Sequence, residues 1–279
     1  MEAKLSLDQI RIQIDRIDTE LLRLLNERAD LVHEIGTIKK NAGLPIYAPE
    51  REESLLQGLI QKSKGRLPAE AIRAIYREIM SASLALEKDL TIAFLGPEAT
   101  WTHQAARSKF GLSVKYTPES SISDVFARVT RGTADYGVVP IENSLEGAVN
   151  HTLDVFMDSE LKICAQILLR IRNDLLSKWS RDQITKIYSH PQVFGQCRQW
   201  LQENARDLEL IEVSSTTRAA QIAATEPAAA ALASSMAAEV YGLQVLETSV
   251  QDSPNNTTRF LVISDLPIIT IVRACCARR

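Results

Sequence analysis

The chain has 279 residues, 45% of them hydrophobic and 24% charged, and its 32 Lys and Arg against 35 Asp and Glu give a net charge of −3. This composition excludes a disordered or collagen-like chain, and the length predicts about two domains. Because neither sign of charge dominates, nothing indicates nucleic acid or an anionic membrane as the main partner.

Neither the cysteines nor the glycines form the motif of a cofactor site. The four cysteines make no C-x-x-C pair, and no Cys/His cluster has the spacing of zinc ligands. The glycines are too far apart for G-x-G-x-x-G, and Val138 follows Gly137 where a P-loop needs lysine. The start lacks the apolar stretch of a signal peptide, and charges interrupt every apolar run before the ~18 residues of a membrane span. We therefore expect a cytoplasmic protein that uses no metal, cofactor or membrane.

A long amphipathic helix is predicted at the beginning of the chain. Apolar residues recur with heptad spacing from Leu7 to Ile38, Ser6 or Asp8 is placed to cap the start, and Gly43 ends the pattern. A helix of about 35 residues is ~50 Å long, more than one small domain covers. Other helices or a second copy of the chain must therefore pack on it.

Two further helices complete an all-α domain over residues 1–90. One covers 49–62 and starts at a proline followed by acidic residues; the other covers 68–88. We expect the apolar face of the last helix to hold Ile72, Ile75, Ile79, Ser83 and Leu86.

Charged side chains interrupt the apolar seam of the long helix. Arg28 occupies a seam position, where an isolated guanidinium is costly and needs a partner. At 100° per residue Lys39 lies about 20° from Arg28 and Arg11 about 100° away, which predicts one pocket for the first two and another for Arg11. Two interpretations are open: solvated salt bridges with a single buried Arg–Glu pair, or a binding site for an anion.

This segment resembles the all-helical class of chorismate mutase, across nearly all of residues 5–90. The resemblance rests on charged and polar residues in a fixed order: Arg11, Arg28, Lys39, Arg51, Glu52, Ser83 and Glu87. It implies an intertwined homodimer in which the long helix carries Arg11 into the partner's site. One departure is Ala48, because some members have an aspartate there that contacts the substrate hydroxyl.

The reaction of this class is an intramolecular pericyclic rearrangement of chorismate to prephenate. It needs no nucleophile or cofactor, so the enzyme holds a dicarboxylate in its compact conformer and stabilises charge on the ether oxygen. Arginine binds carboxylates bidentately, and the resemblance gives this role to Arg11, Arg28 and Arg51.

The ether oxygen is assigned to another pair by the same resemblance. Lys39 and Glu87 flank this oxygen, while Glu52 and Ser83 position the ring hydroxyl and the cations. Glu87 donates a hydrogen bond only when protonated, so we expect mutase activity to fall as the pH rises towards neutrality.

From Thr91 onward the pattern changes to alternating strands and helices, which predicts an α/β domain over residues 91–265. Strands are expected at 91–96, 136–141, 161–171, 187–189, 208–214, 228–234, 243–249 and 258–264. Helices are expected at 103–111, 122–132, 192–204, 216–224 and 236–242. The last residues, 266–279, are expected to form an irregular tail.

Four polar segments lie beside strand ends in this half, at 96–103, 140–147, 188–197 and 255–260. In open α/β folds the loops at such ends form the ligand cleft, although these residue types also serve as turn and cap residues. Together the segments resemble prephenate dehydratase across 91–263. The matching motifs are G-P-x-x-T, V-V-P-I-E-N-S followed by E-G, S-H-P-Q and T-R-F.

The dehydratase resemblance implies two α/β lobes, similar to type II periplasmic binding proteins, with the site between them. It makes Thr258 the proton donor to the leaving hydroxyl of prephenate. The residues expected to bind substrate are Thr100, Asn143, Ser144, Ser189, Gln196 and Arg259. Most are uncharged donors, which orient a departing carboxylate without stabilising the ground state against decarboxylation.

The order of the halves resembles the bifunctional chorismate mutase/prephenate dehydratase family of phenylalanine biosynthesis, because the first product is the second substrate. That family normally continues into a phenylalanine-binding ACT domain; its motifs are missing here, and we expect weak or absent feedback inhibition. Two alternatives stay open. A mutase fused to a dehydrogenase is disfavoured by the missing G-x-G-x-x-G, and an α/β half that only senses a small acid is disfavoured by the intact T-R-F.

Overall fold

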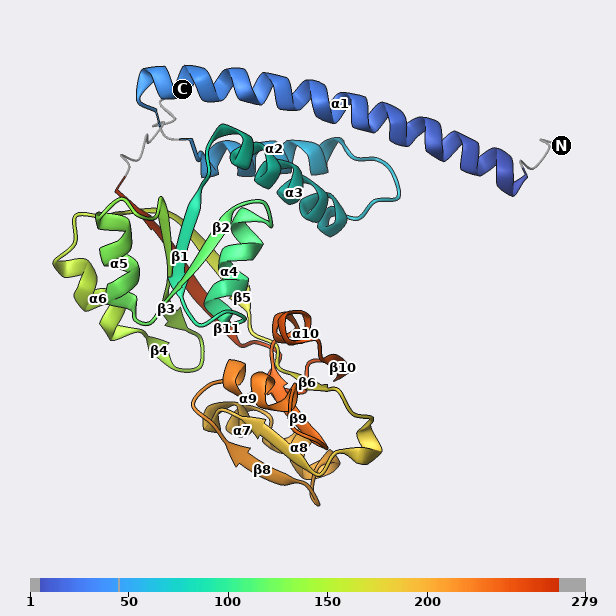
Figure 1. Ribbon diagram of the computed structural model, residues 1–279, viewed down its shortest axis with the longest axis vertical. Coiled ribbons are helices and arrows are strands. Elements are labelled where there is room, and N and C mark those ends of the chain that lie inside the picture. Colours follow the sequence, from blue (N-terminus) through green and yellow to red (C-terminus); the bar gives the residue numbers. More distant parts are fainter. Residues whose placement is uncertain (1–5, 45, 266–279) are drawn as a thin grey trace, which may run out of the picture. The chain divides into compact units, whose positions relative to one another are not determined.

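The computed structural model describes residues 6–44 and 46–265, so the expected tail at 266–279 lies outside the described residues. The described residues divide into two compact units, a helical one up to Leu90 that also includes Leu112–Val114, and an α/β one formed by Thr91–Gly111 and residues 115–265 (Figure 1). In the described part of the chain no helix combines the length and apolar character needed to cross a bilayer.

The helical unit has the three predicted helices. They are α1 (Leu7–Ala42), α2 (Pro49–Lys62) and α3 (Ala69–Glu87). Ser6 and Gln9 form a reciprocal capping box at the start of α1, and Gly43 ends it in the left-handed conformation with φ 64°. The predicted cap, length and stop of the long helix are thus confirmed.

Most apolar side chains of α1 are exposed within one chain. None of its residues is buried, and Ile17 and Leu21 are 59% and 51% exposed. Figure 1 shows the N-terminal part of α1 extending beyond α2 and α3. The half-buried residues of α1 follow helical spacing on its C-terminal part: Arg28, Ala29, Val32, Gly36 and Lys39.

The face of α3 that packs inside the helical unit differs from the predicted one. Ile72 and Ser83 are buried as expected, but Ile75 and Leu86 are 48% and 56% exposed. The buried stripe is completed by Met80, Ser81 and Leu84. At 100° per residue the five predicted residues do share one face, but in one chain only part of that face meets α1 and α2. Apolar periodicity does not say which part is covered.

The first lobe of the α/β unit is built on a six-stranded sheet in the order β2-β1-β3-β11-β5, with β4 paired to β3. Its strands are β1 (Thr91–Leu95), β2 (Lys115–Glu119), β3 (Tyr136–Asn143), β4 (Gly147–Ala148), β5 (Lys162–Arg170) and β11 (Thr257–Ser264). The helices are α4 (Trp101–Phe110), α5 (Ile122–Thr130) and α6 (Asn150–Met157). β1, β2 and β3 are parallel, whereas β11 runs antiparallel to both β3 and β5.

The second lobe has a five-stranded sheet in the order β10-β6-β9-β7-β8. Its strands are β6 (Asp174–Ser177), β7 (Lys186–Ser189), β8 (Glu209–Glu212), β9 (Ala229–Ala233) and β10 (Gln244–Glu247). The helices are α7 (Pro191–Gln196), α8 (Arg198–Asn204), α9 (Thr216–Ala223) and α10 (Ser235–Tyr241), with a short 3₁₀ turn at Arg181–Gln183. The alanine-rich β9 lies at the centre, where small side chains let helices pack closely.

The chain crosses between the lobes twice, once after β5 and once before β11. The two crossing segments are hydrogen-bonded, because the Ile171 N–H donates to Asn256 O at 2.8 Å and the Val250 N–H to Asn173 O at 2.8 Å. The prediction of a helical domain followed in sequence by a two-lobed α/β fold is confirmed.

Several elements differ from the sequence predictions. The helix expected at 192–204 is divided at the buried Cys197, whose φ of −115° and ψ of 22° leave helical geometry. The elements β2, β4, β6 and α6 were not predicted. β2 contains a proline and exposed polar residues, and β6 has only four residues, so neither carries a clear alternating pattern.

Candidate active sites

A polar cluster joins α1 to α3 in the helical unit. The Arg28 guanidinium donates a hydrogen bond from Nη1 to Ser83 Oγ, and the Ser83 hydroxyl donates to the carbonyl of Ile79 at 2.8 Å. Arg28, which interrupts the apolar seam of α1, therefore has a polar and buried partner, Ser83, on the neighbouring helix.

One turn further along α3, Glu87 is paired with Lys39. The Lys39 ammonium lies 3.2 Å from Glu87 Oε2 and also donates to Ile46 O at 2.6 Å. The Glu87 side chain is only 6% exposed and that of Lys39 22%. Arg28 and Lys39 therefore face adjacent positions of α3, as their angular separation predicts, and the buried ion pair is Lys39–Glu87 rather than an Arg–Glu pair.

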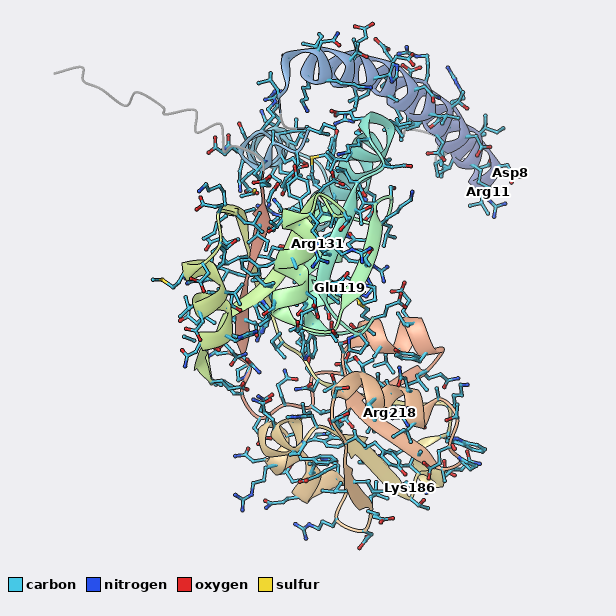
Figure 2. The ribbon with its side chains drawn as sticks, turned by 60° about the vertical axis from the view of Figure 1, so that its left-hand side comes forward. Asp8, Arg11, Glu119, Arg131, Lys186 and Arg218 are labelled. Carbon is cyan, nitrogen blue, oxygen red and sulfur yellow. The ribbon has the colours of Figure 1, made fainter. Side chains whose placement is uncertain are left out.

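Arg11 does not join this cluster within one chain. It lies near the other end of α1, about 26 Å from Arg28 at 1.5 Å per residue. Its Nη1 lies 3.6 Å from Asp8 Oδ1, and the two side chains are 67% and 87% exposed (Figure 2). Arg51 is exposed and Glu52 is half-buried at the start of α2.

The α/β unit contains a cavity of about 270 Å³. Its wall includes polar residues from the first lobe, the second lobe and the crossing segments: Thr100, Asn143, Asn173, Gln196, Asn256 and Thr258. Among the described residues of this wall only Glu146 is ionisable, and it is exposed. The cavity therefore offers mainly neutral hydrogen-bonding groups.

Asn143 organises the polar wall. It ends β3 directly opposite Thr258 in the β3/β11 ladder. Its amide Nδ2 donates to Thr258 Oγ1 at 2.8 Å and to Asn256 Oδ1 at 3.0 Å, and its Oδ1 accepts from the Leu145 N–H at 2.8 Å. Because the Thr258 oxygen accepts from Asn143, its own proton is free for another acceptor.

The network continues across the cavity. Asn256 Nδ2 lies 3.3 Å from Gln196 Oε1, which links a crossing segment to α7 of the second lobe. Antiparallel pairing of β3 with β11 and the end of α7 thus bring together the predicted residues Asn143, Thr258 and Gln196, which are far apart in sequence.

Thr100 caps α4 at another part of the wall. Its hydroxyl donates to Leu95 O at 3.0 Å and accepts from the His103 N–H at 3.3 Å. His103 Nδ1 accepts from the Ala99 N–H at 3.1 Å, and its ring stacks on Phe94. Burial lowers the pKa of His103 to about 4, with a further lowering by the Arg107 charge, so the imidazole is neutral at pH 7.

Comparisons with known proteins agree with both halves. The prephenate dehydratase family model matches residues 92–267, and the model of chorismate mutase type II matches residues 10–88. A bifunctional chorismate mutase/prephenate dehydratase from Aquifex aeolicus is 50% identical over 263 residues, which cover 92% of this chain and 73% of that protein. The chain belongs to this family.

Two other relatives support the assignment. The bifunctional chorismate mutase/prephenate dehydratase of Pseudomonas aeruginosa is 43% identical over 266 residues, 93% of this chain and 73% of that protein. A crystal structure of prephenate dehydratase from Arthrobacter aurescens in complex with L-Phe is 32% identical, with a TM-score of 0.58, and covers 64% of this chain and 61% of that one. We refer to the matched regions below as the mutase and dehydratase domains.

Three residues predicted to bind substrate do not line the dehydratase cavity. The buried Ser189 hydroxyl donates to Leu232 O at 2.8 Å within the second lobe. Ser144 Oγ accepts from the Thr257 N–H at 3.0 Å, so it ties the end of β3 to β11. Arg259 follows Thr258 on a strand and therefore points to the opposite face, where its Nη1 lies 3.5 Å from Glu142 Oε2.

Sequence reasoning missed Asn173 and Asn256 on the cavity wall. Asn256 lies directly before the T-T-R-F run, so its place beside Thr258 was accessible from the sequence. Asn173 belongs to no recognised motif, and only the first crossing between the lobes brings it to the cavity.

Proposed function

We propose that the helical domain, residues 1–90, rearranges chorismate to prephenate and that the α/β domain, residues 91–265, converts prephenate to phenylpyruvate, water and carbon dioxide. These are consecutive steps of phenylalanine biosynthesis. The observation that carries the second step is the Asn143–Thr258 hydrogen bond on the cavity wall, in which the Thr258 oxygen accepts and its proton stays available to a substrate oxygen. The alternative function, an α/β domain that only binds a small acid, does not require a proton donor.

The substrate of the mutase domain is a dianion, so the cationic side chains of this domain are the candidates for binding its carboxylates. Arg28 is positioned by Ser83 and Lys39 by Glu87, so both are held on one side of α3 before substrate arrives. We assign carboxylate binding to Arg28 and Arg51, and assign the ether oxygen to the Lys39–Glu87 pair. Pre-positioned charge stabilises the developing ether oxygen without reorganisation during the reaction.

A homodimer completes this proposal. The exposed apolar side chains of α1 supply a surface for a second copy, since a long amphipathic helix is stable only when its apolar stripe is covered. In the resulting pair, Arg11 of each copy reaches the site of the other. Among the described residues of one chain, Arg11 has an ion pair only with the exposed Asp8, and this placement accounts for that.

In the dehydratase domain Thr258 donates its proton to the hydroxyl that leaves the prephenate ring. A threonine is a weak acid, so the hydrogen bond strengthens as negative charge develops on the departing oxygen, which is preferential stabilisation of the transition state. Thr100, Asn143 and Gln196 orient the carboxylates without a salt bridge that would oppose decarboxylation. We assign Ser144, Ser189 and Arg259 to support the strand ends on which these groups stand.

The test is to assay the purified full chain separately on chorismate and on prephenate. We expect Thr258→Ala to lower dehydratase kcat by ~100-fold or more with near-normal substrate binding, because one hydrogen-bond donor to the leaving group is removed. Thr258→Ser, which keeps the hydroxyl, retains much more activity, and mutase activity is unchanged in both variants. Loss of both activities in Thr258→Ala, with the protein still folded, contradicts the division of labour between the domains.

A further inference from the structure

Asn173 has a buried side-chain amide without a hydrogen-bond partner in the described part of the chain. Its side chain is fully buried, and neither Oδ1 nor Nδ2 is bonded to any described residue. The backbone of the same residue is fixed on both sides, because its N–H donates to Gln251 Oε1 at 2.9 Å and its carbonyl accepts from the Val250 N–H at 2.8 Å. Leaving a primary amide buried and unpaired is unfavourable, so such groups in native proteins call for a ligand or another explanation.

The position of this amide indicates a ligand. Asn173 belongs to the wall of the dehydratase cavity. Three other amides of this wall are already engaged, since Asn143 bonds to Thr258 and Asn256, and Asn256 bonds to Gln196. The remaining one, Gln192, is exposed. Among the described residues with buried, unpaired side-chain atoms, Asn173 is the one that the cavity wall includes.

Asn173 and Thr258 lie at separate points of the cavity. Thr258 pairs with Leu169 in the β5/β11 ladder, four residues before Asn173 along the chain. Four extended residues span at most about 14 Å, so Asn173 lies further along the same cavity wall, beyond the end of β5. In prephenate the ring hydroxyl and the pyruvyl side chain lie at opposite (para) positions of the ring. A substrate whose hydroxyl meets Thr258 therefore directs its pyruvyl end away from Thr258, along the cavity.

We propose that the Asn173 amide binds the 2-oxo acid group of the pyruvyl side chain, with Nδ2 donating to its oxygen atoms. This inference rests on the proposed dehydratase function. The 2-oxo acid group is kept unchanged from prephenate to phenylpyruvate. The contact is therefore equally strong in substrate, transition state and product, and it contributes to binding rather than to turnover.

Asn173→Leu is the decisive variant, because leucine has a similar shape and no polar atoms. We expect KM for prephenate and Kd for phenylpyruvate, measured by calorimetry, to rise together by ~10- to 100-fold, while kcat changes less than threefold. Mutase activity is the internal control. Because an unpaired polar group is replaced by an apolar one, the midpoint of thermal unfolding stays constant or rises.

The same measurements separate this inference from a structural role and from failure of the proposed function. A lower unfolding midpoint with unchanged phenylpyruvate affinity overturns the inference, because the amide then serves the fold. Equal affinity of wild type and Asn173→Leu at equal stability also overturns it, as does wild type that does not bind phenylpyruvate. If wild type binds phenylpyruvate and the variant binds it weakly, but prephenate is not turned over, the binding inference stands and the dehydratase proposal fails. Asn204→Leu, on the exposed end of α8, is the matched control and leaves phenylpyruvate affinity unchanged.

Discussion

The two domains arrange the polar groups of their predicted sites in opposite ways. In the mutase domain the predicted groups are charged apart from Ser83 and lie on helices, and the clustered ones have partners on the neighbouring helix, as in Lys39–Glu87. In the dehydratase domain they are neutral, lie at strand ends and are linked into one network by Asn143. The mutase domain leaves the apolar side of α1 exposed, whereas the dehydratase lobes bury their own cores.

This difference shows how the fold class determines whether one copy of the chain can form a complete site. A sheet brings distant segments side by side, so one copy assembles the whole dehydratase cavity. A single long helix separates its own residues, since Arg11 and Arg28 are about 26 Å apart at 1.5 Å per residue. A site that needs both must therefore take them from two copies.

Complementation between inactive variants gives the largest effect and tests this contrast directly. Arg11→Ala and Arg28→Ala are each expected to lose mutase activity by ~100-fold, as a carboxylate loses a charged partner. In a mixed dimer one site carries both intact arginines and the other neither, so random exchange of equal amounts restores roughly one quarter of the wild-type rate. Mixing followed by a chorismate assay checks this, with dehydratase activity constant throughout. No recovery after verified subunit exchange contradicts the shared site.

The second prediction concerns the pH dependence of the mutase domain alone. Glu87 pairs with Lys39 as a carboxylate and donates a hydrogen bond to the ether oxygen only when protonated, so we expect activity to fall as the pH rises towards neutrality. Glu87→Gln donates through its amide at every pH, so its profile of kcat/KM flattens. Rates measured from pH 4.5 to 8.5 test this, and an unchanged slope in the variant removes Glu87 from the role.

The third prediction concerns the stability of the dehydratase domain. Burial lowers the pKa of His103 to about 4, against about 6.5 in the unfolded chain. Between pH 6.5 and 4 His103 is protonated in the unfolded chain but stays neutral in the folded one. Its contribution to the free energy of unfolding is therefore fully present above pH 6.5 and is lost as the pH falls towards 4. The loss reaches about 3 kcal/mol.

A substitution isolates this contribution. In His103→Asn the side-chain oxygen still accepts from the Ala99 N–H, but the group no longer titrates, so the fall in unfolding free energy between pH 6.5 and 4 is smaller. Urea unfolding followed by the fluorescence of the dehydratase domain measures it. The same fall in both proteins would show that other groups cause the acid sensitivity.

The smallest expected effect compares two helical glycines. A Cβ added at Gly36 meets Glu87 Cγ at 3.0 Å, whereas one added at Gly58 meets nothing within 4 Å. Gly58→Ala is expected to raise stability by up to ~1 kcal/mol through helix propensity, with no change in activity. Gly36→Ala has the same propensity gain but displaces Glu87, so mutase kcat falls several-fold. Equal kcat in the two variants contradicts a positioning role for Gly36.

Sequence patterns predicted those features of the structure that depend on residues close together in the chain. Ser6, Gly43 and the heptad run fixed the limits of α1, because capping and amphipathic periodicity act within a few residues. The motifs likewise predicted Thr258, Asn143 and Gln196 as site residues, and the three lie on one cavity wall. The sequence alone also indicated that α1 needs a cover larger than its own domain.

Tertiary structure decided which side chains share a wall. Ser189 and Arg259 stand in the expected motifs but point elsewhere, because strand alternation and the packing of the second lobe set their direction. Asn173 reaches the cavity only because two crossing segments pair between the lobes. Such long-range pairing depends on the register of strands far apart in sequence, and no local pattern of residues encodes that register.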